Sequence, residues 1–282
     1  MPELPEVETI VRKLRQFLPG QKIAKLDTFH AKPFSGNREV LINATVTDVQ
    51  RRAKIIQIVL DNDHQILIHL KMTGQLIYID KNHRIGGGHP TADWVQDLPS
   101  KHTRLGFTFA SEAQLFFNDQ RLFGWVKLMP TVEVAAIFAP LGPDIIDVTV
   151  TLEYLLDKFK KRRQPIKQVL MDNAVVCGVG NIYACDALNL AQLSPFRPAN
   201  SLSEEEVAKL LTTTQQVITK GVELGGTTFD GKYVDIDGMA GKYQSMVRVY
   251  GREGKPCLHC GTEIIKKQLG GRGTYYCPQC QI

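Results

Sequence analysis

The chain has 282 residues, 43% of them apolar, which is enough to form one large core or two modest ones. Glu3, Glu6 and Glu8 occupy the place where a secretory signal would carry basic residues, so we expect no signal peptide. No apolar run approaches the length of a membrane span, so we expect no contact with a membrane and a cytoplasmic protein.

The chain begins Met1-Pro2-Glu3, and removal of Met1 would leave Pro2 with a free secondary amine beside a carboxylic acid. A secondary amine that attacks a sugar C1′ gives an iminium ion with no N–H to lose, so the ion stays cationic and promotes elimination. The alternative is that Pro2 is only a flexible start, with Pro5 opening a helix at its first turn. The N-terminus alone favours this alternative.

The first half of the chain predicts one helix followed by many short strands. Apolar residues recur at helical spacing from Pro5 to Leu18, where Pro19-Gly20 follows. From there to about residue 129 no helix separates the strands, which favours antiparallel sheets in a β-sandwich. The clearest strands are expected at 55–60, 65–70, 76–79, 105–109, 115–117 and 125–128. The glycine-rich stretch 84–100 predicts a long surface loop.

The second half predicts helices after a linker at 131–148, which is rich in Pro and Gly. Helical patterns cover about 151–162, 165–173, 180–190 and 203–223. The last of them begins with the spacing of a capping box, from Ser203 to Glu206.

The turn Gly178-Val179-Gly180-Asn181 comes immediately before one of these helices. Two glycines there let backbone amides approach an anion closely, and the helix dipole adds to the attraction. Asn181 is then in place to donate to a phosphate. An ordinary tight turn with an Asn cap is the alternative.

Four cysteines near the C-terminus form two C-x-x-C pairs separated by sixteen residues. They are Cys257, Cys260, Cys277 and Cys280. This spacing is typical of a four-cysteine zinc site, in which a full set of thiolates leaves no open position and the metal is structural. Two disulfides or four unrelated thiols are the alternatives. Cys177 and Cys185 lie in an apolar segment, so we expect them to be small buried residues.

Positive charge is concentrated in the tail of the chain. From Lys242 onward seven Lys or Arg face two Glu, which accounts for the whole net charge of +5. A second basic run covers 158–163 and continues to Lys167. Basic clusters beside a zinc site indicate a surface that contacts nucleic-acid phosphates. For the run at 158–163 alone, a solvated helix face is the default interpretation.

Three segments together resemble the formamidopyrimidine-DNA glycosylase family over the whole chain. PELPEVETI is similar to its opening, VVCGVGNIYACDAL to its helix–two-turn–helix motif, and GRGTYYCPQCQ to its zinc finger. Leu4 favours this branch over the sister endonuclease VIII branch, which typically reads PEGPE. The resemblance implies an α+β multidomain fold, with a β-sandwich and N-terminal helix, a helical domain and a zinc-finger β-hairpin. The expected domains are 1–130, 149–242 and 243–282, with the linker at 131–148.

The resemblance also implies a function in base-excision repair. A monomeric enzyme with one structural Zn²⁺ would remove 8-oxoguanine and formamidopyrimidines from duplex DNA, then cut the abasic site by β,δ-elimination. Three alternatives stay open. They are the same chemistry on oxidised pyrimidines, a damaged-DNA-binding protein without turnover, and a zinc-ribbon protein that binds other proteins.

The resemblance implies four catalytic residues. Pro2 matches the nucleophile, Glu3 the acid that assists base loss or sugar opening, and Lys54 the lysine of β-elimination. Arg272 matches the finger arginine that contacts phosphate and is linked to δ-elimination. The segment 227–242 would cap the flipped base as a lid, although its sequence is unusual for the family.

A second group of residues is implied to contact the duplex. An enzyme that acts on a base must take it out of the stack, which costs a few kcal/mol, and inserted side chains can offset that cost. Met72 matches the residue that fills the gap left by the flipped base, and Arg121 and Phe123 match the other two inserted residues. For Met72 and Phe123 taken alone, packing in the core is the alternative. The other matching DNA contacts are His69, His102, Arg162, Lys167 and Asn181.

Overall fold

The computed structural model describes residues 2–89, 97–227 and 241–282. The chain forms two compact units, Met1–Ala139 with Leu224–Gln244, and Pro140–Glu223 with Ser245–Ile282. The described residues 224–227 and 241–244 thus group with the first unit. The boundaries expected at 130, 148 and 242 stay predictions.

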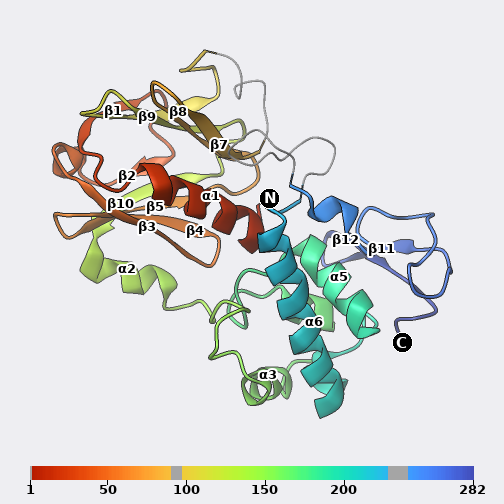
Figure 1. Cartoon of the computed structure of the whole chain (residues 1–282). Coiled ribbons are helices and arrows are strands. Elements are labelled where there is room, and N and C mark those ends of the chain that lie inside the picture. The colour runs from red at the N-terminus through yellow and green to blue at the C-terminus, as the bar shows by residue number, and fades with distance from the viewer. Residues whose placement is uncertain (1, 90–96, 228–240) are drawn as a thin grey trace. The chain divides into compact units, whose positions relative to one another are not determined.

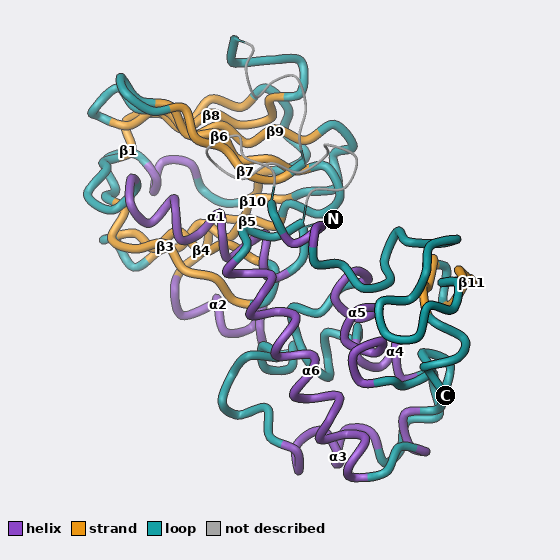
Figure 2. The backbone as a smooth tube through the Cα atoms, turned by 45° about the vertical axis from the view of Figure 1, so that its right-hand side comes forward, coloured by secondary structure: helices purple, strands orange, loops and turns teal. Residues whose placement is uncertain are grey.

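The first unit is built on two five-stranded sheets that form two layers (Figures 1 and 2). One sheet has the order β1 (Ile23–Thr28), β8 (Thr103–Phe109), β9 (Gln114–Asp119), β6 (Gly74–Ile79), β7 (Arg84–Gly88). The other has the order β2 (Phe34–Ser35), β10 (Trp125–Pro130), β5 (His64–His69), β4 (Ile55–Leu60), β3 (Val46–Arg52). Every neighbouring pair is antiparallel except β2 and β10. The predicted antiparallel sandwich is therefore confirmed.

Apolar side chains from both sheets meet in one core, since alternate strand residues point to the same face. Its members include Ile56, Ile68, Phe107, Phe117 and Val126. The helix α1 (Leu4–Phe17) covers one side of this core (Figure 1). It contacts β3 and β7, each of which is an edge strand of its sheet. The helix therefore covers the side of the sandwich at which these two edges lie.

The prediction of a loop over the whole of 84–100 was wrong, because Arg84–Gly88 forms strand β7 against β6. A run of three glycines is typical of a loop, but here the lack of a side chain has a packing role. A Cβ atom on Gly87 would lie 2.2 Å from Cγ1 of Ile10 in α1, so only glycine lets the helix approach the strand. Residues 90–96 of the expected loop lie outside the described residues.

Residues 131–148, which we expected to be a linker, contain the helix α2 (Thr131–Phe138). Val134 on α2 packs against Ile55 and Leu67, so this helix covers the outer side of the second sheet. Among the described residues, 3₁₀ helices lie at Arg38–Leu41, Ala199–Ser201 and Tyr243–Ser245.

The second unit contains four α-helices and a β-hairpin in its described residues. They are α3 (Leu152–Phe159), α4 (Ile166–Leu170), α5 (Asn181–Ala191) and α6 (Glu204–Glu223), with β11 (Ile265–Leu269) and β12 (Arg272–Tyr276). The capping box of α6 is confirmed, since Ser203 N donates to Glu206 and Glu206 N donates to the Ser203 hydroxyl. α5 is central, because it contacts α4, α6 and β12.

No helix among the described residues is long and apolar enough to cross a membrane.

Candidate functional site

Pro2 and Glu3 lie directly before α1, and both are buried. The helix begins here because the carboxylate of Glu6 accepts a hydrogen bond of 2.8 Å from the backbone N–H of Glu3, as in a capping box. Pro5 occupies the first turn, where no backbone donor is needed. The expected removal of Met1 concerns a residue outside the described part of the chain.

Glu6 also fixes the base of the segment expected to act as a lid. Its Oε1 atom accepts bonds from the backbone N–H of Thr227 at 2.9 Å and from the Thr227 hydroxyl at 3.1 Å. Thr227 in turn pairs with Lys242 as an antiparallel bridge. One carboxylate thus joins the residue next to Pro2 to the start of the segment 227–242. Residues 228–240 of that segment lie outside the described residues.

Lys54 lies in the two-residue turn between β3 and β4 and is 7% exposed. The preceding Ala53 has φ of 55°, in the left-handed region that L-residues rarely adopt. Arg51 stabilises this turn by donating to the Ala53 carbonyl at 2.9 Å and to the carboxylate of Glu8 on α1 at 2.8 Å. Burial acts to raise the pKa of Glu8, but bonds from Arg51 and Arg12 outweigh it and lower that pKa. The helix that follows Pro2 and the turn that carries Lys54 are therefore tied together.

His69 ends strand β5, and its Nδ1 accepts a hydrogen bond of 3.0 Å from the backbone N–H of Lys71. Burial, together with the positive charges of Lys71 and Lys54, lowers the pKa of His69 from 6.5 to about 3. The ring is therefore neutral at physiological pH and carries its proton on Nε2. Lys54 and His69, which are 15 positions apart in the sequence, are thus close enough for the charge of one to lower the pKa of the other.

Two adjacent connections carry the three residues expected to enter the duplex. Met72 lies between β5 and β6 and is 42% exposed, and Phe123 lies between β9 and β10 and is 50% exposed. The guanidinium carbon of Arg121 lies 4.7 Å from the centre of the Phe123 ring, which is a cation–π contact. Large exposed apolar residues on neighbouring loops fit contact with a partner rather than a core.

His102 precedes β8, and its carbonyl accepts from the backbone N–H of Asp119.

In the second unit, two residues that we expected at the phosphates are hydrogen-bonded to each other, and a third lines the same pocket as one of them. Lys167 on α4 is 1% exposed, and its Nζ donates to Oδ1 of Asn181 at 2.6 Å. Asn181, the first residue of α5, donates to the carbonyl of Gly273 in the finger at 3.0 Å. Arg272 is exposed beside the hairpin tip, and it lines a surface pocket together with Lys167 and Gly270.

Two glycines place the hairpin tip on α4. Gly270 and Gly271 have φ of 56° and 73°, which the two-residue turn between β11 and β12 requires. A Cβ atom on Gly270 would lie 2.2 Å from Nε2 of Gln168 on α4. Arg162, three residues after the end of α3, forms an ion pair of 2.6 Å with Asp172, and both line a second pocket.

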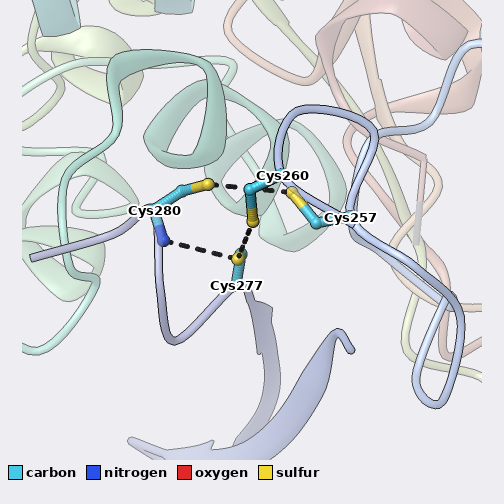
Figure 3. A group of neighbouring side chains, drawn as sticks. All are labelled: Cys257, Cys260, Cys277 and Cys280. Carbon is cyan, nitrogen blue, oxygen red and sulfur yellow. Dashed lines mark hydrogen bonds between the residues drawn. The ribbon is translucent and has the colours of Figure 1, made fainter. Parts of the chain in front are cut away.

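The four paired cysteines converge, although the two pairs are far apart in the sequence (Figure 3). Their sulfur atoms all lie within 4.8 Å of one another, with Sγ separations of 3.5 Å for Cys260–Cys277 and 3.9 Å for Cys257–Cys280. Thiolates about 2.3 Å from a tetrahedral zinc ion would be separated by roughly 3.8 Å, so the sulfur positions fit such an ion. All six cysteines are free thiols, which excludes the alternative of two disulfides in this structure.

Cys177 and Cys185 are fully buried, as expected for small core residues. Burial raises the pKa of the Cys185 thiol to about 11. Neither Cys177 nor Cys185 belongs to the group of four neighbouring sulfur atoms.

Family comparisons cover nearly all of this architecture. The formamidopyrimidine-DNA glycosylase N-terminal domain matches residues 1–126, the H2TH domain of the same family matches 141–232, and the zinc finger found in FPG and IleRS matches 254–282. The chain belongs to the formamidopyrimidine-DNA glycosylase family. The predicted family and fold class are therefore confirmed.

Full-length relatives support this assignment. The formamidopyrimidine-DNA glycosylase of Pelotomaculum thermopropionicum is 37% identical, and that of Desulforamulus reducens is 39% identical. Each comparison covers 100% of this chain and 99% of the relative. Among solved structures, Lactococcus lactis Fpg bound to DNA with an abasic site has a TM-score of 0.88 at 30% identity, covering 99% of both chains. The Thermus thermophilus protein has a TM-score of 0.85 at 34% identity, covering 99% of this chain and 98% of that one.

Several side chains that organise the sites were missed from the sequence. They are Glu6; Thr73 and Asp119, whose hydroxyl and carboxylate are hydrogen-bonded to each other; and Thr274, whose hydroxyl accepts from Lys167. The spacing of Glu3 and Glu6 matches a capping box and could have identified Glu6. The other residues contact partners distant in the sequence, and no local pattern marks them.

Proposed function

We propose that this chain excises oxidised purines from duplex DNA through Pro2 and then cuts the abasic site by β,δ-elimination. The observation that carries the proposal is the start of α1, where the Glu6 carboxylate fixes the backbone at Glu3, the residue that follows Pro2. The full-length match to DNA glycosylases supports the enzyme class. A secondary amine there can form a cationic iminium with C1′, since nitrogen already carries two carbon substituents.

Glu3 is proposed as the acid that assists base departure and ring opening. Its side chain is buried beside the nucleophile, and a carboxyl group in such a position can move a proton within a water-poor site. Lys54 is proposed to act in β-elimination. The strained turn at Ala53 and the Arg51–Glu8 ion pair hold it in place without a flexible loop.

Duplex DNA is the proposed partner of both units. Met72, Arg121 and Phe123 would fill the space left by the flipped base, because they are exposed on adjacent loops. Phosphates would be held by His69 through Nε2–H, by Arg272, and by the Lys167–Asn181 cluster. His102 and Arg162 are proposed as further contacts. A cytoplasmic, monomeric enzyme fits this substrate.

The metal is proposed to be one Zn²⁺ per chain, held by Cys257, Cys260, Cys277 and Cys280. The sulfur separations and the all-cysteine ligand set support zinc over harder ions, which prefer oxygen ligands. When bound, the ion would supply structure rather than chemistry, because four thiolates leave it no open position. Its role would be to keep the hairpin that presents Arg272 in shape.

Oxidised pyrimidines are the second candidate substrate class. Lactococcus lactis Fpg, at 30% identity and a TM-score of 0.85, was crystallised with DNA that contains an oxidised pyrimidine. The same chemistry at C1′ would serve either class of base, so substrate choice depends on what surrounds the flipped base.

Borohydride trapping tests the proposed reaction. Duplexes with one 8-oxoguanine, one formamidopyrimidine or one oxidised pyrimidine are incubated with the enzyme and borohydride, and the adduct is mapped by mass spectrometry. We expect DNA on the peptide that begins at Pro2, with the purine lesions trapped fastest. An adduct on Lys54 would overturn the assignment of Pro2. Absence of both base release and adduct would instead identify a damage-binding protein without turnover.

Two variants separate the steps. Glu3→Gln should reduce release of the base more than cleavage of a pre-formed abasic site, because only the first step needs protonation of a leaving base. An added N-terminal tag should abolish both activities, since it converts the amine of Pro2 into an amide.

A further inference from the structure

We propose that Asp119 and Thr73 are positioning residues that lock the two wedge loops, defined as residues 70–73 and 120–124, in the conformation that enters DNA. The inference rests on the proposed function, in which Met72, Arg121 and Phe123 on these loops replace the flipped base. Neither Asp119 nor Thr73 needs to touch DNA. Each acts by fixing residues that do.

The topology of the sandwich places the two wedge loops side by side. The loop after β5 crosses from the second sheet to β6 in the first, and the loop after β9 crosses back to β10. β6 pairs with β9 through Gly74 and Asp119, and β5 pairs with β10 through His69 and Trp125. Both crossings therefore start and end on paired strands, which brings their tips together.

The carboxylate of Asp119 connects the two loops. It is fully buried, and its Oδ1 accepts a hydrogen bond from the hydroxyl of Thr73 on the first loop. On the second loop, the backbone N–H of Arg121 donates to the same oxygen at 3.2 Å, and the N–H of Gly124 donates to Oδ2 at 2.7 Å. The Arg121 N–H also reaches the Thr73 hydroxyl at 3.1 Å, so the three residues close a ring of contacts.

The backbone between these contacts is in a conformation that would not persist without support. Lys71, directly before Met72, has φ of 50°, and Leu122, directly before Phe123, has φ of 56°. Both values lie in the left-handed region, which is unfavourable for residues with a Cβ atom. Such strain persists only where the surroundings fix it, and here each strained residue orients the neighbouring wedge side chain.

Gly124 completes the lock by letting the second loop approach the carboxylate. A Cβ atom there would lie 3.1 Å from Oδ2 of Asp119 and 2.8 Å from the ring of Phe117. The result is a pair of loops whose exposed tips are ordered before DNA arrives, with Arg121 already stacked on Phe123. Ordering them in advance removes an entropic cost that insertion would otherwise have to meet.

The test compares Thr73→Val with Thr73→Ser in the full-length enzyme. Valine has the shape of threonine but loses the hydroxyl, whereas serine keeps it. The readout is the ratio of two single-turnover rates, base release from paired 8-oxoguanine against cleavage of a pre-formed abasic site, where little stacking remains to be broken. We expect Thr73→Val to lower this ratio by about tenfold or more, as for loss of a hydrogen bond to a charged group, and Thr73→Ser to restore it.

A second variant and a fluorescent probe protect the test against simple misfolding. Asp119→Asn should lower the same ratio, and 2-aminopurine placed opposite an abasic analogue should show a weaker change on binding with Asp119→Asn and Thr73→Val than with wild type. Equal losses for Thr73→Val and Thr73→Ser, or equal losses on both substrates, would overturn the proposal. If wild type itself releases no base, the proposed function fails; an unchanged 2-aminopurine response in both variants would then separately refute the lock.

Discussion

The ammonium group of Lys167 donates a hydrogen bond of 2.7 Å to the hydroxyl of Thr274, 107 positions later in the chain. Both side chains are buried, and the bond joins helix α4 to strand β12 of the finger. The same ammonium binds Asn181 at the start of α5. A residue that we expected mainly at a phosphate therefore also holds three elements of the second unit together.

Thr274→Val should destabilise the second unit, because a buried cation loses one of its oxygen partners at constant side-chain shape. A hydrogen bond to a charged group contributes about 1.5–3 kcal/mol, so the free energy of unfolding should fall by about this amount. Denaturation followed by the circular dichroism of the helices measures it. In a Lys167→Met background the same change should have little effect, since the cation is gone, whereas additive losses would contradict the coupling.

The local elements were predictable because their signals are local. Helix α1 occupies Leu4–Phe17, close to the 5–18 expected from apolar periodicity, and strand β4 at Ile55–Leu60 coincides with its apolar run. Likewise, the C-x-x-C spacing alone predicted the cysteine cluster. Each of these depends on residues near one another in the chain.

Contacts between distant segments were not predictable in the same way. Strand β7 was missed because three glycines indicate a loop, and only the approach of Ile10 explains why they form a strand. The sequence does not distinguish the buried Asp119 from an aspartate on the surface. The three groups that donate hydrogen bonds to its carboxylate come from two loops. Burial and pairing of charged groups depend on the tertiary fold, which one sequence does not display.

Removal of the metal should affect the finger before the sandwich. We expect elemental analysis to find one zinc ion per chain, and Cys260→Ser to lose it together with most DNA affinity, because the hairpin that carries Arg272 depends on the site. The matched control is Cys177→Ala, since that thiol is fully buried, lies outside the four-cysteine cluster and should leave the zinc content at one. A metal-free protein with full DNA affinity would refute the structural role.

The salt dependence of DNA binding should distinguish the proposed phosphate contact of Arg272 from the proposed insertion of Met72 into the duplex. Arg272 is exposed, and loss of one phosphate contact lowers the slope of log affinity against log salt by about 1, so Arg272→Ala should show that change. Met72→Ala removes no charge and should leave the slope nearly unchanged while reducing activity on paired lesions. Binding titrations at several salt concentrations measure both variants, and equal slopes would contradict the division of roles.

His69 should make the folded protein sensitive to acid. Its pKa is lowered from 6.5 to about 3 by burial and by Lys71 and Lys54, so below pH 6.5 the unfolded chain binds a proton that the folded chain does not. The stability associated with the neutral ring is complete above pH 6.5 and is lost as pH falls toward 3. The loss approaches about 1.4 kcal/mol per pH unit as an upper limit.

His69→Asn is the variant that tests this, because the Asn side-chain oxygen can still accept from the Lys71 N–H in place of Nδ1. It removes the titrating group, so its free energy of unfolding should fall less steeply than that of wild type between pH 6.5 and 4.5. Denaturant titrations at half-unit pH intervals measure the two curves. Curves that stay parallel throughout this range would mean that the His69 ring takes up its proton equally in the folded and unfolded states, in contradiction to its burial near the charges of Lys71 and Lys54.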